Sequence, residues 1–192
     1  IVFGDWSSDV CSSDLRVLPW RQTRDPYLIW LCEVIMQQTR IDQGLPYYER
    51  YAARYPAVRD LAAAPEDAVL KLWEGLGYYT RARNMHRTAK RIVEEYNGEF
   101  PRKAELLQLL PGIGRYAAGA IASIAFGEAV PVVDGNVRRV LSRLFDLDAC
   151  IDEPQTEREL WRIAASLVPA ANPGDFNQAI MELGATFCSP RK

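Results

Sequence analysis

Short helical patterns separated by turn residues run through this chain from Pro26 onward, and they constrain its fold more than any other feature. Apolar residues recur at helical spacing in ten segments: residues 27–39, 46–54, 58–63, 66–73, 79–96, 103–109, 116–126, 136–145, 157–168 and 176–187. Strand character is confined to residues 130–133, which are too few to found a sheet. The sequence therefore predicts an all-α fold of modest helices and short connections.

Composition narrows the class of protein. With 192 residues, 48% of them apolar, the chain is long enough for one compact domain or two small ones that share a core. A net charge of −2 means that any surface for nucleic acid must be local. No apolar run reaches the length of a membrane span and no signal-peptide pattern is visible, which excludes an integral membrane protein. Paired spacing is absent among Cys11, Cys32, Cys150 and Cys188, which argues against a disulfide scaffold and indicates a reducing compartment.

Residues 1–15 differ from the rest of the chain. They repeat Ser-Ser-Asp, begin without Met and have neither a helical nor a strand period. We interpret them as a non-native leader from cloning or sequence assembly, or as a disordered terminus, and leave them out of the fold prediction.

A glycine-rich turn precedes a helix of small residues. Residues 110–114 read Leu-Pro-Gly-Ile-Gly, in which Gly112 and Gly114 allow a left-handed backbone and a close approach. The N-terminus of the following helix, residues 116–126, offers free N–H groups suited to a phosphate. The alternative is a plain tight turn between two packed helices. The segment is similar to the helix-hairpin-helix motif, which grips the DNA backbone.

Two carboxylates are candidates for acid–base chemistry. Glu33 has apolar neighbours along its helix, Ile29, Trp30 and Met36, so it lies either at a solvated edge or buried as a general acid with a raised pKa. Asp134 precedes a helix, and its simplest role is an N-cap. Beside Glu33 it would also complete the pair of an acid and an anion that cleaves glycosidic bonds.

Amide, aromatic and basic side chains suggest contact with bases and phosphates. Residues 37–39 (Gln-Gln-Thr) and 77–79 (Gly-Tyr-Tyr) can hydrogen-bond base edges and wedge between bases; the alternative is an exposed helix end and two core tyrosines. Basic residues gather in two groups, which are either solvated faces or phosphate contacts: Arg81, Arg83, Arg87, Lys90 and Arg91, then Arg138, Arg139 and Arg143. His86 is read as structural or as a phosphate contact, and Cys32 and Cys150 as core residues.

Four of these motifs occur in a characteristic order, at residues 33–39, 75–84, 110–114 and 133–139. Together they resemble the adenine DNA glycosylases of the MutY type, in the helix-hairpin-helix superfamily, over residues 16–192. The resemblance implies a base-excision repair enzyme that removes adenine paired with 8-oxoguanine or guanine. It also implies a monomer that acts on double-stranded DNA in the bacterial cytoplasm.

The resemblance assigns roles to individual residues. Glu33 falls on the general acid that protonates adenine N7, and Asp134 on the carboxylate that stabilises the oxocarbenium-like sugar. Tyr116 and Asn136 fall on positions that line the catalytic site. The adenine pocket would include Arg16, Leu18, Trp20 and Arg21. The opposite base would be probed by Gln38, Thr39 and Tyr78, and the DNA backbone held by Gly112, Gly114 and Arg138.

The implied architecture has two lobes. Residues 27–126 would form a six-helix barrel that carries the hairpin, and residues 16–26 with 127–192 a second helical lobe, with Asp134 at the junction. The family's second lobe holds a [4Fe-4S] cluster on four cysteines. Cys188 matches the first of them, and the other three would lie beyond Lys192. We therefore expect a fragment of a longer protein, whose cluster is not assembled in this chain.

Alternatives from other classes stay open. Endonuclease III, which removes oxidised pyrimidines, carries a catalytic lysine where this chain has Tyr116, and tyrosine cannot form the Schiff base of a lyase. A monofunctional glycosylase is therefore expected. A non-catalytic DNA-binding module would need Gly112 and Gly114 but neither Glu33 nor Asp134. A helical interaction scaffold would show no salt-dependent DNA binding.

Overall fold

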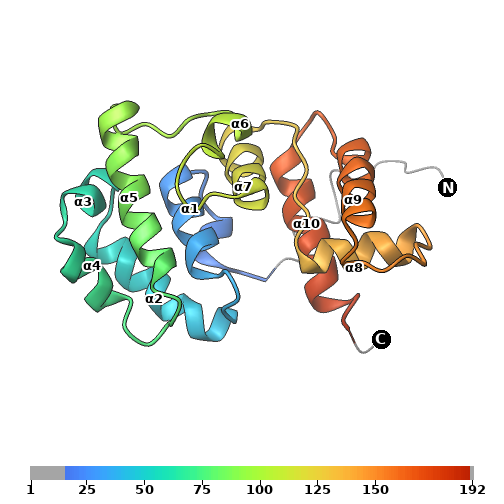
Figure 1. The fold of residues 1–192 in the computed structure, drawn as a ribbon, viewed down its shortest axis with the longest axis horizontal. Coiled ribbons are helices and arrows are strands. Elements are labelled where there is room, and N and C mark those ends of the chain that lie inside the picture. Colours follow the sequence, from blue (N-terminus) through green and yellow to red (C-terminus); the bar gives the residue numbers. More distant parts are fainter. Residues whose placement is uncertain (1–15, 191–192) are drawn as a thin grey trace.

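The computed structural model describes residues 16–190, and the leader of residues 1–15 lies outside them. The described part is all-helical, without a β-strand, so the predicted fold class is confirmed (Figure 1). Its elements are η1 (Pro19–Arg21), α1 (Pro26–Ile35), α2 (Ile41–Arg54), α3 (Val58–Ala63), α4 (Glu66–Leu72), α5 (Thr80–Glu95), α6 (Ala104–Leu107), α7 (Arg115–Phe126), α8 (Gly135–Leu144), α9 (Pro154–Leu167) and α10 (Pro173–Thr186). Within these residues, no helix combines the length and hydropathy that crossing a membrane requires.

The largest differences from the predicted boundaries have local causes. Helix α1 ends at Ile35 rather than at residue 39, because the chain turns there and Gln38 adopts a left-handed φ of 54°. Helix α2 begins at Ile41, so Pro46 lies inside it and does not start it. Helices α9 and α10 begin three residues early, at Pro154 and Pro173, where the missing proline N–H costs no helical hydrogen bond.

Two hydrophobic clusters lie side by side. The larger one is built from α1 to α7, and Trp30, Trp73 and Ile121 are fully buried in it. The smaller one is built from α8 and α9 around Leu141 and Leu160. Met181 of α10 packs against both clusters, and Figure 1 shows α10 between α7 and the pair α8 and α9. The boundary between the clusters is therefore where side chains from both can meet.

Helix α7 can lie at this boundary because its residues are small. A Cβ on Gly119 would stand 2.6 Å from the carbonyl oxygen of Pro131, in the segment that leads to α8. On α10, a Cβ on Gly174 would stand 2.7 Å from Cα of Ile124 at the end of α7. Close packing at these two glycines brings the start of α8 and the middle of α10 beside the first turn of α7.

Residues 16–26 tie the two clusters together. Trp20 packs edge-on against Tyr48 of α2, with ring centroids 5.1 Å apart, and joins the larger cluster. From the same segment, Arg16 and Arg21 bind Glu182 of α10. The N-terminal segment thus contacts both sides of the boundary.

Candidate active site

Glu33 lies on α1 where that helix passes the start of α7. The helix begins at the N-cap Asp25, whose carboxylate accepts the Tyr27 N–H at 2.8 Å, and the faces around Glu33 are buried in the larger cluster. Burial raises the pKa of Glu33 to about 7; a hydrogen bond with Tyr116 opposes the rise, and the negative charge of Asp134 adds to it. The structure favours the acid with a raised pKa over the solvated edge, because Glu33 is only partly exposed and its carboxyl can hold a proton near neutral pH.

Asp134 is an N-cap, as its place in the sequence predicts, and its charge also acts on Glu33. It is the N-cap of α8, and its Oδ1 accepts the Val137 N–H at 2.7 Å. Its Oδ2 accepts a hydrogen bond from Nδ2 of Asn136 at 2.9 Å. Burial raises the pKa of Asp134, and these two hydrogen bonds limit the rise. The capping geometry aims the carboxylate at the boundary, close enough to Glu33 for the two charges to interact.

Asn136 is itself held in place by an arginine. Nη2 of Arg139 donates to Oδ1 of Asn136 at 2.8 Å and to the carbonyl oxygen of Gly184 at 2.7 Å. Nε of Arg139 donates to the carbonyl oxygen of Cys188 at 2.5 Å. Arg139 therefore ties α8 to the end of α10 and does not face solvent as a phosphate contact.

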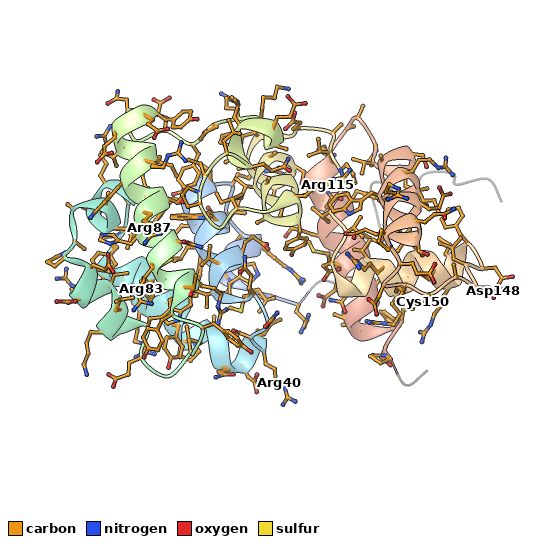
Figure 2. All side chains as sticks on the ribbon, in the orientation of Figure 1. Arg40, Arg83, Arg87, Arg115, Asp148 and Cys150 are labelled. Carbon is orange, nitrogen blue, oxygen red and sulfur yellow. The ribbon has the colours of Figure 1, made fainter. Side chains whose placement is uncertain are left out.

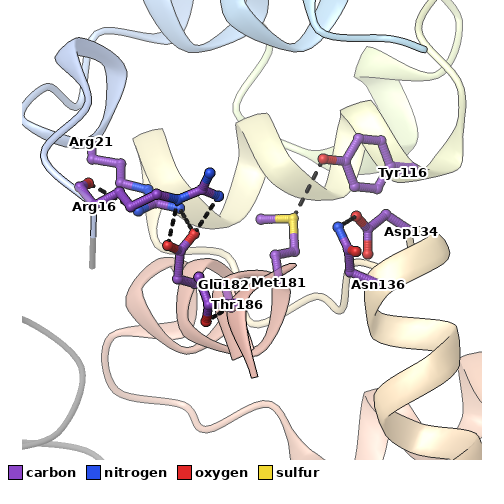
Figure 3. A network of polar contacts seen from close by, with 8 residues as sticks. All are labelled: Arg16, Arg21, Tyr116, Asp134, Asn136, Met181, Glu182 and Thr186. Carbon is purple, nitrogen blue, oxygen red and sulfur yellow. Dashed lines mark hydrogen bonds and ion pairs between the residues drawn. The ribbon is translucent and has the colours of Figure 1, made fainter. Parts of the chain in front are cut away.

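Tyr116 stands in the first turn of α7 and faces both α1 and α10. Its hydroxyl lies 3.4 Å from Sδ of Met181 (Figure 3). The hydroxyl also hydrogen-bonds the Glu33 carboxyl. Burial and the carboxylates of Glu33 and Asp134 raise the pKa of Tyr116 well above its ordinary value, so the hydroxyl stays protonated. It can donate a hydrogen bond, and it carries no amine.

Two cavities meet at these residues. The large cavity has a volume of about 970 Å³, and the small cavity has about 230 Å³. Glu33, Tyr116 and Asp134 line both, so they form the wall between the two. The remaining lining separates the predicted residues into two sets: Gln38, Tyr78, Gly112 and Arg138 at the large cavity, and Arg16, Leu18, Trp20, Arg21, Thr39 and Asn136 at the small one.

The small cavity has apolar residues such as Leu18, Trp20 and Ile29 in its lining, and a further charged group besides Glu33 and Asp134. Glu182 of α10 is 4% exposed and accepts hydrogen bonds from Nε of Arg16 at 2.6 Å and from Nη2 of Arg21 at 2.6 Å (Figure 3). Burial alone would raise the pKa of Glu182, but the two guanidinium groups outweigh it and bring the pKa to about 2. This carboxylate is therefore an anion at neutral pH that can only accept hydrogen bonds.

Sequence reasoning missed Glu182 and its neighbour Gln178, which also lines the small cavity. A signal was present, because both are polar residues in a largely apolar helix, one turn apart. The partners that give Glu182 its meaning lie more than 160 positions away in the chain, so helix periodicity alone does not reveal them.

Exposed residues border the large cavity. Tyr78 is 71% exposed, so the interpretation of Tyr78 and Tyr79 as two core residues is wrong. Gly112 has a φ of 76°, and a Cβ there would stand 2.9 Å from Cβ of Asn84, so this position needs glycine. Gly114 is extended and a Cβ there meets nothing, so the predicted need for a left-handed backbone holds for Gly112 alone.

The structure divides the basic groups. Arg81 points inward and donates to the carbonyl oxygen of Gln37. Two others form ion pairs, Arg91 with Glu95 and Arg138 with Glu157. Arg83 and Arg87 lie on the exposed face of α5 (Figure 2). His86 is the only histidine in the sequence, and its side chain is 1% exposed. Its Nε2 lies 2.9 Å from the carbonyl oxygen of Ala64, and burial lowers its pKa. These contacts favour the structural interpretation of His86.

The cysteines separate as well. Cys32 is buried as predicted, but Cys150 is exposed in the turn after α8, so the prediction of a core residue there is wrong (Figure 2). Sγ of Cys188 lies 3.1 Å from Nη1 of Arg143. Residues 16–190 contain no group of three or more His, Cys, Asp or Glu side chains placed to hold a metal ion. One thiolate does not fit a cluster that needs four.

Comparison with known proteins agrees with this geometry. Residues 31–166 match the model of the HhH-GPD superfamily base excision DNA repair proteins. The chain is 49% identical to the human adenine DNA glycosylase over 92% of this chain and 34% of that protein, and 39% identical to that of Buchnera aphidicola (Schizaphis graminum) over 91% and 50%. A solved thermostable thymine-DNA glycosylase superimposes with a TM-score of 0.84 at 31% identity, covering 94% of this chain and 83% of that one. The chain thus spans about a third to a half of the length of these two adenine glycosylases.

Proposed function

The chain belongs to the HhH-GPD superfamily of base excision DNA repair proteins, and on this premise we propose that it is an adenine DNA glycosylase. It would hydrolyse the N-glycosidic bond of adenine paired with 8-oxoguanine or guanine in double-stranded DNA. Relatives that carry this name support the proposal. The observation that carries it is the position of Glu33, a carboxyl with a pKa of about 7 in the wall between two cavities, beside Asp134.

The small cavity would receive the flipped base. A base in a duplex must leave the stack before a buried acid can reach it. The apolar walls at Leu18, Trp20 and Ile29 suit the faces of a purine ring, and the Glu182 anion suits a donor such as an exocyclic amine. Adenine carries that amine, whereas a carbonyl at the same position would place an acceptor against a carboxylate that can only accept hydrogen bonds.

Glu33 and Asp134 would divide the chemistry. A protonated Glu33 donates its proton to N7 of the base, which makes adenine a better leaving group, and a positioned acid contributes about 100-fold to 10,000-fold. As the bond from the base to the sugar C1′ breaks, the sugar gains positive charge, and the Asp134 carboxylate, which lines both cavities, would stabilise it. Water then adds to C1′, and the proton that it loses passes to the Glu33 carboxylate, which restores the acid. Asn136 and Val137 keep Asp134 aimed through this step.

Strand cleavage would not accompany base release. A lyase forms a Schiff base between an amine and the sugar C1′. Within the described residues no lysine lines either cavity, and Tyr116 occupies the wall beside Glu33. The product would be an abasic site in an intact strand.

DNA would lie along the large cavity. The exposed Gln38 and Tyr78 border it on one side and the hairpin at Gly112 on another, where backbone N–H groups at the start of α7 can meet a phosphate. The cluster implied by the resemblance has no step in this mechanism. We propose that Cys188 would be one of its ligands in a longer chain.

A single-turnover assay on a labelled duplex with adenine opposite 8-oxoguanine tests the proposal. Strand breaks that appear only after hot alkali would support a monofunctional adenine glycosylase. Breaks without alkali would contradict the absence of lyase chemistry. If no base is released although the duplex binds in a salt-dependent manner, the non-catalytic module is the better description.

A further inference from the structure

Two loops border the large cavity, and each presents an exposed residue in a strained conformation. The Gln38 loop (residues 36–40) joins α1 to α2, and the Tyr78 loop (residues 73–79) joins α4 to α5. Gln38 has a φ of 54° and Tyr78 a φ of 47°. Side chains other than glycine persist in this region only where the surrounding contacts hold them. Something in the fold must therefore fix both loops.

Arg81 makes the contacts that the Gln38 loop requires. It lies in the first turn of α5, and its guanidinium reaches across to the end of α1. Nη1 of Arg81 donates to the carbonyl oxygens of Gln37 and Ile35, the latter at 3.2 Å, and to Oγ1 of Thr39 at 3.3 Å. The Ile35 carbonyl is one of those that the end of α1 leaves without a helical partner, and the other two acceptors belong to the loop itself.

The same guanidinium also holds the Tyr78 loop. Nη2 of Arg81 donates to the carbonyl oxygen of Leu76 at 3.4 Å. The guanidinium carbon lies 5.7 Å from the ring centroid of Tyr78 and 5.2 Å from that of Trp73. A planar group with several donors can serve two loops and a ring at once, which a lysine ammonium cannot do.

We propose that Arg81 is a positioning residue that locks the Gln38 and Tyr78 loops into one rigid unit for reading the strand opposite the excised base. This inference rests on the proposed function. Arg81 acts through Gln38 and Tyr78, and it makes no hydrogen bond with Glu33 or Asp134. Its removal should weaken engagement of the duplex and leave the chemical step intact.

Amide hydrogen exchange on the free chain tests the lock without DNA. Arg81→Met keeps the length of the side chain and removes its donors. Exchange of the amides in both loops should become at least about tenfold faster, while the buried helices α1 and α7 keep their protection. The matched control is Arg83→Met on the same helix, where the exposed guanidinium contacts only Glu66 at 3.8 Å. That control should change neither loop.

A kinetic split then tests the link to function. In single-turnover experiments, Arg81→Met should raise the enzyme concentration for half-maximal adenine release about tenfold or more and change the rate at saturation by less than about threefold. Arg81→Lys keeps the positive charge but loses the planar set of guanidinium donors, so its half-saturation concentration should lie between those of the parent chain and Arg81→Met. The same variant replaces Arg81→Met if the latter does not fold.

The outcomes are distinguishable. If Arg81→Met leaves amide exchange in the two loops unchanged, the proposed role of Arg81 is overturned. An equally large increase in loop exchange for Arg83→Met would overturn it as well. A fall in the saturated rate without a change in half-saturation would place Arg81 in the chemical step and also overturn it. If the parent chain releases no adenine, the proposed function fails, while loop exchange and duplex titration still decide whether Arg81 holds the loops.

Discussion

Replacing Glu33 by glutamine should make the protein more stable and inactive at the same time. The pKa of Glu33 is about 7 in the fold, against an ordinary value of 4.5, because burial disfavours its charge. The folded chain therefore keeps a proton that the unfolded chain releases. Between pH 4.5 and 7 the stability of the parent chain falls as the pH rises, since ionisation favours the unfolded state. At 1.36 kcal/mol per pKa unit, the loss is about 3 kcal/mol above pH 7.

Glutamine has nearly the same volume and no charge at any pH, so the variant escapes this loss. Glu33→Gln should match the parent near pH 4.5 and exceed its free energy of unfolding by up to about 3 kcal/mol at pH 8. Urea unfolding at the two pH values measures the difference. The control is Glu49→Gln on α2, which makes the same change at an exposed position. Adenine release by Glu33→Gln should fall at least about 100-fold.

Two results would refute this reasoning. If Glu33→Gln gains nothing at pH 8 relative to pH 4.5, burial does not raise the pKa of Glu33, and the assignment of a protonated acid fails. If the variant is stabilised but still releases adenine at the parent rate, Glu33 is a buried acid without a part in proton transfer.

Three further predictions follow from the same geometry. Tyr116→Phe removes a hydrogen bond that lowers the pKa of Glu33. The alkaline limb of the single-turnover rate profile should therefore move to higher pH by about one unit. A shift to lower pH would contradict the contact between Tyr116 and Glu33. Glu182→Gln should lower the free energy of unfolding by about 3 kcal/mol at pH 7, because the lowered pKa of Glu182 stabilises the fold while the group is ionised. Urea titrations should show this difference shrinking as the pH falls from 4.5 to 2. Gly112→Ala should cost about 1–3 kcal/mol and weaken duplex binding in a filter or anisotropy titration, whereas the matched Gly114→Ala should stay within about 0.5 kcal/mol; equal effects would contradict the backbone assignment.

The helices could be predicted from the sequence because they depend on local information. Apolar spacing predicts the ten α-helices of residues 16–190, though not the short η1. The small residues at 116–126 indicate close packing, which Gly119 makes against Pro131. The boundaries failed where a local signal was ambiguous. The sequence predicts a helix start at Pro46, but α2 contains this proline. It predicts a helix that runs to residue 39, but the turn at Gln38 removes residues 37–39 from α1.

The candidate site shows where local patterns stop being sufficient. Glu33 and Glu182 are both glutamates on apolar helix faces, both line the small cavity, and burial pushes the pKa of each upward. Their protonation states are nevertheless opposite, with pKa values of about 7 and about 2, because Arg16 and Arg21 reach Glu182 and no arginine pairs with Glu33 among the described residues. Those arginines come from the far end of the chain. An acid and an anion can therefore face one cavity only after the N-terminal segment docks, and the same Glu→Gln change should stabilise the fold at one position and destabilise it at the other.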